Sequence, residues 1–244
     1  MNLEDRIESY WSKRSDKFYD LRVEELNSDK RKLWEDEIIS NLPDKENLKI
    51  LDVGCGPGFF SVILASLGHK VVGIDLTKSM IDRAKQIADM LDYDIDFRVM
   101  NAQELDFDDE EFDVVISRNL TWTLPDIEKA YREWYRVLKK DGVLLNFDAD
   151  YGKVSFKEEA KTLGEDHAHS KIEVDLMEEC DNIKEELDIS KRERPVWDKE
   201  YLKQIGFESC KTDYKVSERI YKVKDDFYNP TPMFKVCAVK MASV

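Results

Sequence analysis

The chain of 244 residues carries 53 acidic and 38 basic residues, a net charge of −15 that argues against a nucleic-acid substrate, because a phosphate backbone would be repelled. It contains no apolar run of about 18 residues that could span a membrane, and its polar start, MNLEDRIESYWSKR, lacks the layout of a signal peptide. We therefore expect a cytoplasmic protein that binds neither nucleic acid nor a membrane.

The first 42 residues predict two helices. Apolar residues at helical spacing recur from Leu3 to Phe18 and again from Leu26 to Leu42, and Pro43 ends the pattern. The length of the whole chain suits one large core, so we expect these helices to pack on a single domain.

Residues 48–75 predict the first half of a nucleotide-binding βαβ unit. The octapeptide LDVGCGPG at 51–58 follows one apolar run, and a second apolar run closes at Asp75. Glycines let the backbone turn sharply and approach a ligand, the following helix offers free N–H groups, and a carboxylate can accept hydrogen bonds from two ribose hydroxyls. The glycines of this turn are Gly54, Gly56 and Gly58.

The charge around this turn indicates which kind of ligand it binds. Phe59 stands where the dinucleotide pattern G-x-G-x-x-G needs its last glycine. Asp52 places a carboxylate at the mouth of the turn, which would repel a pyrophosphate but would tolerate an ammonium or a sulfonium. We therefore predict a cationic ligand. Cys55 within the turn is interpreted as a small filler, and the four scattered cysteines predict neither a disulfide framework nor a zinc site.

The remaining sequence alternates between helix and strand patterns and ends with two strands that we expect to pair antiparallel at one edge of the sheet. In chain order, we expect a helix over 77–92, strands over 96–102 and 112–117, a helix from Pro125, a strand over 143–147, a charged helical segment over 151–190, a helix over 197–207, and strands over 207–215 and 233–239.

Four blocks in this order and at this spacing resemble the class I S-adenosylmethionine-dependent methyltransferases, particularly the small-molecule group that includes enzymes of ubiquinone and menaquinone biosynthesis. The blocks are LDVGCGPG, GIDLTKSM at 73–80, NAQELDFDDEEFDVVISRN at 101–119 and LPDIEKAYREWYRVLKKDGVLL at 124–145. The resemblance is close over residues 48–148. It implies an α/β fold, a seven-stranded Rossmann-like doubly wound sheet that is mostly parallel with an antiparallel last strand, plus N-terminal helices and an inserted helical lid.

The resemblance also divides the chain by role within a single folding unit. It implies an N-terminal helical cap (1–42), an S-adenosylmethionine-binding core (43–150), a lid insertion (151–195) and the C-terminal part of the core sheet (196–244). The helices of the cap would cover the cofactor cleft, where Tyr10, Trp11 and Tyr19 would wall the methionine end of the cofactor or anchor the helix to the core.

Site residues follow from the same resemblance. The family usually carries an aspartate where Asn101 stands, as an acceptor for the adenine amino group, and the carbonyl oxygen of the asparagine can still accept. Thr121 and Trp122 would face the substrate, unless Trp122 packs under the next helix. The expected cofactor-binding residues are Tyr19, Asp52, Gly54, Cys55, Gly56, Gly58, Asp75, Leu76, Met80, Asn101, Ala102, Gln103, Arg118 and Asn119.

The lid contains two of the three histidines, His167 and His169. Either could act as a general base toward the acceptor, since an imidazole titrates near neutral pH, or both could belong to a solvated surface. Two histidines spaced i, i+2 lie on different faces of a helix and lack an obvious third ligand, so no metal site is predicted.

The function implied is transfer of a methyl group from S-adenosyl-L-methionine to a small-molecule acceptor by in-line displacement, with S-adenosyl-L-homocysteine as product, in a monomer or a homodimer. Two alternatives remain open. A nicotinamide-dependent oxidoreductase would share the βαβ start but would bind NADH. A non-catalytic S-adenosylmethionine-binding regulator would bind the cofactor without turning over an acceptor.

Overall fold

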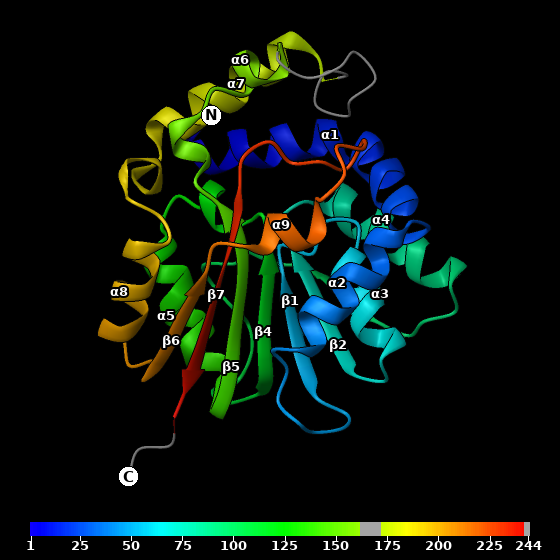
Figure 1. Cartoon of the computed structure of the whole chain (residues 1–244), viewed down its shortest axis with the longest axis vertical. Helices are drawn as coiled ribbons and strands as arrows, with labels where there is room; N and C mark the ends of the chain where they lie inside the picture. The colour runs from blue at the N-terminus through cyan, green and yellow to red at the C-terminus, as the bar shows by residue number, and fades with distance from the viewer. Residues whose placement is uncertain (162–171, 242–244) are drawn as a thin grey trace.

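The computed structural model describes residues 1–161 and 172–241, in which seven strands form one sheet (Figure 1). The strand order is β3-β2-β1-β4-β5-β7-β6. Strands β1 to β5 pair in parallel, whereas β7 runs antiparallel to both β5 and β6. The expected Rossmann-like α/β sheet with an antiparallel last strand is thereby confirmed. The strands are β1 (Lys49–Val53), β2 (Lys70–Asp75), β3 (Asp96–Val99), β4 (Phe112–Arg118), β5 (Leu138–Ala149), β6 (Ser209–Asp213) and β7 (Met233–Lys240).

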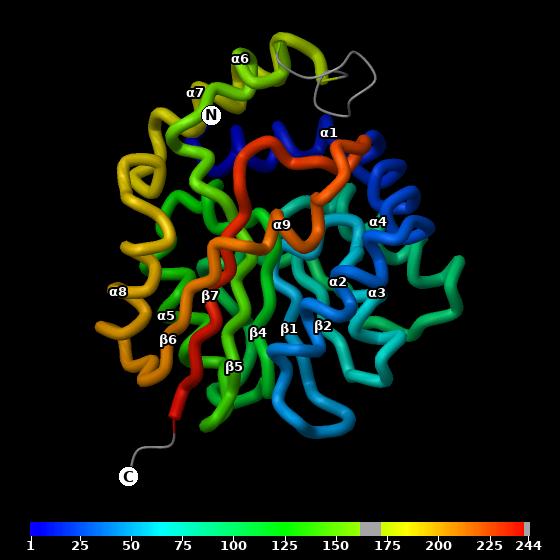
Figure 2. Tube along the Cα trace, viewed as in Figure 1, coloured from blue at the N-terminus to red at the C-terminus, as the bar shows by residue number. Residues whose placement is uncertain are grey.

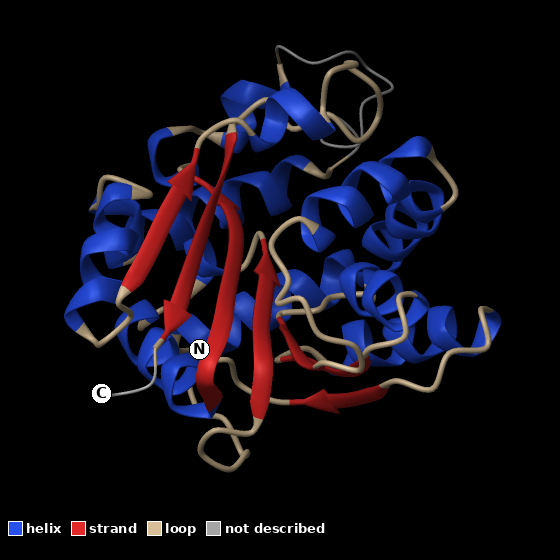
Figure 3. Cartoon of the chain, turned by 60° about the horizontal axis from the view of Figure 1, so that its bottom comes forward, coloured by secondary structure: helices blue, strands red, loops and turns tan. Residues whose placement is uncertain are grey.

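Helices lie on both sides of the twisted sheet (Figure 3). The main helices are α1 (Leu3–Leu26), α2 (Asp29–Ile39), α3 (Phe59–Ser66), α4 (Lys78–Met90), α5 (Ile127–Val137), α6 (Phe156–Ala160), α7 (Val174–Glu186), α8 (Val196–Gln204) and α9 (Val216–Ile220). Single 3₁₀ turns occur at η1 (Thr121–Thr123), η2 (Tyr151–Lys153) and η3 (Asp188–Lys191). Every helix in the described residues is too short or too polar to cross a membrane.

Several boundaries differ from the sequence expectation, and for two of them the cause is visible in the structure. Strand β3 ends at Val99 rather than at 102, because the Asn101 side chain accepts the backbone N–H of Gln103 at 2.9 Å and turns the chain. Strand β5 begins at Leu138 rather than at Val143. Leu138 pairs with Phe112 and Val143 with Val114, so the residues between Leu138 and Val143 form an irregularity that the sequence alone reads as a turn.

Aromatic packing holds one helical layer to the centre of the sheet. The fully buried ring of Trp34 on α2 meets Phe60 of α3 at 5.1 Å and Phe147 of β5 at 5.3 Å, both edge to face. On α5, Trp134 is fully buried and its indole N–H donates to the carbonyl of Ala102 at 3.0 Å. This bond ties α5 to the loop that follows β3.

The end of the sheet at which β1 and β4 terminate is covered by α1, and α7 lies over α1 in turn (Figures 1 and 2). Asn2 caps α1 through a capping box with Asp5, and Arg6 on α1 forms an ion pair with Glu179 on α7 at 2.8 Å. Strands β1 and β4 are neighbours whose connections lead in opposite directions, to β2 and to β5. Ligands of doubly wound sheets bind at such a switch point.

Candidate functional site

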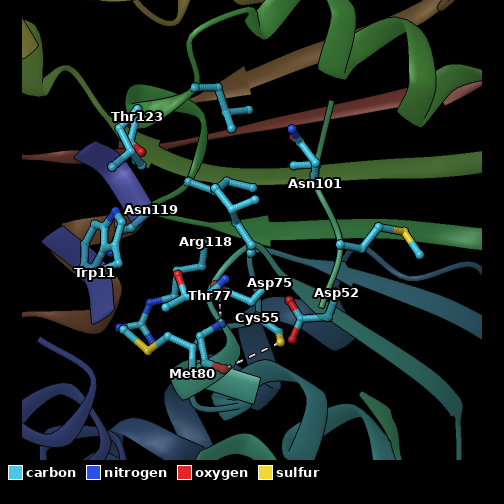
Figure 4. Close-up of a pocket in the computed structure, with 18 of the residues that line it drawn as sticks. Trp11, Asp52, Cys55, Asp75, Thr77, Met80, Asn101, Arg118, Asn119 and Thr123 are labelled. Carbon is cyan, nitrogen blue, oxygen red and sulfur yellow. Dashed lines mark hydrogen bonds between the residues drawn. The ribbon is translucent and has the colours of Figure 1, made fainter. Parts of the chain in front are cut away.

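A cavity of about 120 Å³, here called the inner cavity, lies at the carboxyl ends of β1, β2 and β4, beneath α1 (Figure 4). Most of the residues predicted from the sequence line it: Asp52, Gly54, Cys55, Gly56, Asp75, Leu76, Met80, Asn101, Ala102, Gln103, Arg118 and Asn119. The fold therefore brings together residues from three of the four sequence blocks.

The glycine turn forms one wall of the inner cavity. Gly54, Gly56 and Gly58 all adopt positive φ, at 66°, 51° and 86°, where a side chain would be strained. At Gly54 a Cβ atom would also lie 2.7 Å from the side chain of Leu120. Gly58 is the N-cap of α3 and is not among the residues that line the cavity.

Asp75 lies beside the glycine turn, and two backbone N–H groups hold its carboxylate. Its Oδ2 accepts the N–H of Gly56 at 3.0 Å, and its Oδ1 accepts the N–H of Thr77 at 2.9 Å. Burial raises the pKa of Asp75 above its usual value, and the two N–H donors oppose that rise. Each carboxylate oxygen keeps acceptor capacity for a further donor. The group is thus fixed in orientation and can still accept hydroxyl groups of a ligand.

Asp52 supplies a second carboxylate, at the end of β1. Its side chain is buried, and Ser61 on α3 donates a hydroxyl hydrogen bond to it at 2.6 Å. Burial raises the pKa of Asp52 to about 7, so the group changes charge near neutral pH. A cation bound in the inner cavity would favour its ionised form.

Asn101 has a different environment from the one that the sequence suggests. Its Oδ1 accepts hydrogen bonds from both the backbone N–H and the side-chain amide of Gln103, at 2.9 and 3.1 Å. Its Nδ2 donates to the carboxylate of Glu4 on α1, which also lines the inner cavity. Glu4 is therefore an additional acceptor at this end of the cavity that the sequence did not reveal, because 97 residues separate the two partners.

A buried ionic cluster joins α1 to the sheet. It is formed by Arg22 and Glu25 of α1 with Arg118 of β4. Arg118 donates to both oxygens of Glu25, at 2.8 and 3.2 Å, and to the hydroxyl of Tyr221 at 2.9 Å. Arg22 pairs with the same carboxylate. Burial alone would raise the pKa of Glu25, but the two guanidinium groups hold it below its usual range. The Nε of Arg118 is buried and has no hydrogen-bond partner among the described residues.

A second, larger cavity of about 390 Å³, here called the outer cavity, adjoins the first. The two share Trp11, Phe18, Arg22, Arg118 and Asn119 in their linings. Together they fall within the range of about 300–1,000 Å³ that is typical of small-molecule sites. The structure therefore presents a two-part site with a common wall.

Asn119 lies at this common wall with its backbone in the left-handed region, at φ 55°. Its side-chain oxygen accepts the hydroxyl of Tyr151 at 3.2 Å, and its backbone carbonyl accepts the indole N–H of Trp122 at 2.9 Å. Trp122 itself lines the outer cavity and packs against Tyr151 at 5.0 Å. Trp122 thus faces a cavity, while its expected contact with a substrate stays a prediction.

Other expected residues lie elsewhere. Tyr19 lines neither cavity, and its ring lies under the guanidinium of Arg83 at 5.2 Å. Thr121 is fully buried and donates to Asp148, so it faces away from both cavities. His167 and His169 fall in 162–171, outside the described residues. Within the parts of the chain that are described, no group of three or more histidine, cysteine, aspartate or glutamate side chains could hold a metal ion.

Comparisons with known proteins agree with this geometry. Residues 51–146 match the family described as "Methyltransferase domain". A ubiquinone biosynthesis O-methyltransferase of Bartonella quintana is 36% identical over 100 residues, which are 41% of this chain and 40% of that protein. A ubiquinone/menaquinone biosynthesis C-methyltransferase of Rickettsia prowazekii is 36% identical over 151 residues, which are 58% of this chain and 60% of that protein. The chain spans 40 to 61% of the length of these curated relatives.

Among solved structures, the phosphoethanolamine N-methyltransferase 2 of Haemonchus contortus, in complex with S-adenosyl-L-methionine, superimposes with a TM-score of 0.60 at 20% sequence identity. The superposition covers 84% of this chain and 51% of that one. At this identity the likeness shows a common fold.

Proposed function

We propose that the chain is a class I S-adenosylmethionine-dependent methyltransferase, which transfers the methyl group of S-adenosyl-L-methionine to a small-molecule acceptor. The family match over residues 51–146 and the curated relatives support this assignment. The observation that carries this proposal is the position of Asp75, whose carboxylate is fixed at the inner cavity by the backbone N–H groups of Gly56, in the glycine turn, and of Thr77. This geometry suits a ribose whose two hydroxyls donate to one carboxylate.

The other residues of the inner cavity would hold the two ends of the cofactor. Toward the adenine we assign Leu76, Met80 and Ala102 with the polar pair of Asn101 and Gln103, and Glu4 offers a carboxylate for the amino group. Glu4 lies on α1, and the other five residues follow β2 and β3 in the chain.

Toward the methionine end we assign the glycine turn and Asp52, with Arg118 and Asn119 at the common wall. An ionised Asp52 attracts the ammonium or the sulfonium, and the free Nε of Arg118 suits the carboxylate. The paired charges of the cofactor would thus find partners of opposite sign within one cavity.

The reaction requires little proton transfer by the side chains of the protein. The cofactor, when bound, supplies a methyl group that its sulfonium already activates. The chain's own residues would orient the acceptor and exclude water. Helix α1 and the aromatic side chains Trp11, Phe18 and Trp122, which line the cavities, would separate the reacting groups from solvent. We further propose that residues 151–195 act as the lid of the outer cavity, since α7 packs on α1 above it.

The test begins with the cofactor. We expect the wild-type protein to bind S-adenosyl-L-homocysteine in calorimetry and not to bind NADH in a fluorescence titration. Asp75→Ala should weaken cofactor binding by about 2 kcal/mol, or roughly 30-fold, because it removes charge-assisted hydrogen bonds. Asp82→Ala is the matched control, since Asp82 is exposed on α4 and pairs with Lys78.

Two results would overturn the proposal. One is an unchanged affinity for the cofactor in Asp75→Ala, and the other is a wild-type protein that binds NADH in place of adenosyl compounds. Tight cofactor binding without methyl transfer to any of a broad panel of acceptors would instead favour the non-catalytic regulator.

A further inference from the structure

The outer cavity has an aromatic interior. Its lining includes Trp122 and Tyr151 from the segments that follow β4 and β5, Phe156 at the start of α6, and Tyr221 after α9. These rings also contact one another, with Trp122 at 5.0 Å from Tyr151 and 5.6 Å from Phe156. Aromatic walls of this kind pack best against a flat, apolar ligand, so the cavity suits a planar ring.

Charge in the outer cavity is arranged by depth. Its four carboxylates, on Asp20, Glu24, Glu173 and Asp226, all belong to exposed residues. The cationic side chains of its interior are the buried or half-buried arginines. Two of them, Arg22 and Arg118, share Glu25. The interior of the cavity is therefore positive although the chain carries a net charge of −15.

Arg14 is the third of these arginines, and it differs from the other two in its partners. Within residues 1–161 and 172–241, no acidic group lies within ion-pair distance of its guanidinium, which donates to the hydroxyl of Tyr10 at 2.8 Å. The guanidinium carbon lies 5.5 Å from the ring centre of Trp11 and 6.0 Å from that of Phe18. Contacts with aromatic rings leave the positive charge uncompensated, so a bound anion would gain its full attraction.

The position of Arg14 also separates it from the cofactor. Arg14 lines the outer cavity and not the inner one, whereas Asn119 lines both. The amide nitrogen of Asn119 has no hydrogen-bond partner in the described residues, while its oxygen is held by Tyr151. A ligand that reaches from Arg14 to Asn119 would place its far end at the wall between the two cavities.

We propose that the outer cavity binds the methyl acceptor and that this acceptor is an aromatic carboxylic acid, with its ring against the aromatic wall and its carboxylate on Arg14. This inference rests on the proposed function, because it takes the inner cavity to hold the methyl donor. It assigns Arg14 as the residue that selects the acid over its neutral derivatives. The acceptor atom then lies on the opposite edge of the ring, toward Asn119.

The experiment compares acids with their esters. The protein is saturated with S-adenosyl-L-homocysteine, and a panel of hydroxybenzoic and hydroxynaphthoic acids and the corresponding methyl esters is titrated in by calorimetry. We expect at least one acid to bind about tenfold or more tightly than its ester, as for a charge-assisted hydrogen bond. Arg14→Met should remove this difference by weakening the acid and leaving the ester within about twofold, and Arg14→Lys should restore part of it.

Arg98→Met is the matched control, since Arg98 also lies over an aromatic ring, that of Phe107 at 5.1 Å, and lines neither cavity. An unchanged affinity for S-adenosyl-L-homocysteine in Arg14→Met shows that the variant is folded. This inference is overturned, and the proposed function stands, if S-adenosyl-L-homocysteine binds but no acid is preferred over its ester. The same holds if Arg14→Met keeps the preference for the acid. If S-adenosyl-L-homocysteine does not bind to the wild-type protein, both are overturned.

Discussion

At the scale of single residues, Asp52 provides a pH-dependent test of the cationic ligand. Its pKa of about 7 means that the group is neutral below this pH and ionised above it. Affinity for S-adenosyl-L-methionine should therefore rise between about pH 6 and pH 8, because the ionised carboxylate attracts the sulfonium and the ammonium. In Asp52→Asn the rise should disappear and binding at pH 8 should be about tenfold weaker. Calorimetry at the two pH values measures both effects.

Asp52→Asn should weaken cofactor binding at pH 8 without lowering the free energy of unfolding. Because the pKa of Asp52 in the folded chain lies above its usual value of 3.8, its ionisation costs stability as the pH rises through about 7. Asp52→Asn should thus be at least as stable as the wild type at pH 8. A variant that keeps the pH-dependence of cofactor binding would show that another group is responsible.

Single residues differ in how far the sequence could place them. Asp75 and the glycines could be predicted because their roles depend on local backbone geometry and on the end of a neighbouring strand. The partners of Asn101 could not be predicted, since Glu4 lies on α1, 97 residues earlier in the chain. Arg14 and Arg22 read in the sequence as ordinary charges on a helix, and only the packing of α1 turns them toward the cavities.

At the scale of elements, the contact between α1 and β4 depends on Glu25. Its side chain is fully buried and accepts hydrogen bonds from Arg118 and from the indole of Trp34. Glu25→Gln should destabilise the fold by about 3 kcal/mol, because two buried guanidinium groups would lose their counter-charge. Glu24→Gln, at an exposed neighbouring position, is the control. Denaturant unfolding at pH 7 measures the difference.

The pH-dependence of this difference in stability follows from the lowered pKa of Glu25. Its contribution to stability is present at neutral pH and is lost as the pH falls through the lowered folded value. The gap between the wild type and Glu25→Gln should therefore narrow in acid. Equal stability of the two proteins at pH 7 would mean that the cluster does not hold α1 in place.

The elements themselves were largely predictable, and their ends less so. Helix α4 follows from an apolar stripe after Thr77, and the buried strand β4 from its continuous apolar run. The early start of β5 could not be foreseen, because Asp141 and Gly142 are typical turn residues. The strand continues across them because Leu138 pairs with Phe112 of β4 and Gly142 pairs with Lys240 of β7.

At the scale of the whole molecule, one buried arginine joins the segment before α8 to the sheet and to η1. Arg194 pairs with Asp148 of β5 at 3.1 Å and with Asp198 of α8 at 2.7 Å. Asp148 also accepts the backbone N–H of Trp122 at 2.9 Å, so the same cluster holds an aromatic wall of the outer cavity. The chain order gives no hint of this connection, because its members lie in three distant segments.

Arg194→Met should cost about 3–5 kcal/mol, since it leaves two carboxylates buried without their counter-charge. Arg192→Met, two positions away and exposed, should have little effect. Thermal unfolding of the two variants measures the contrast. A small loss of stability in Arg194→Met would indicate that the Asp148 carboxyl is protonated in the folded chain, in keeping with its pKa, which burial raises.

The common wall between the inner and outer cavities has a thermodynamic consequence for the two chambers that it divides. This wall is formed by Trp11, Phe18, Arg22, Arg118 and Asn119. An occupant on one side that shifts these side chains changes the space open to an occupant on the other side. The methyl donor and acceptor proposed for the two chambers should therefore act as heterotropic effectors of each other. Reciprocity then requires that each alters the dissociation constant of its neighbour by an identical factor, whichever is added first.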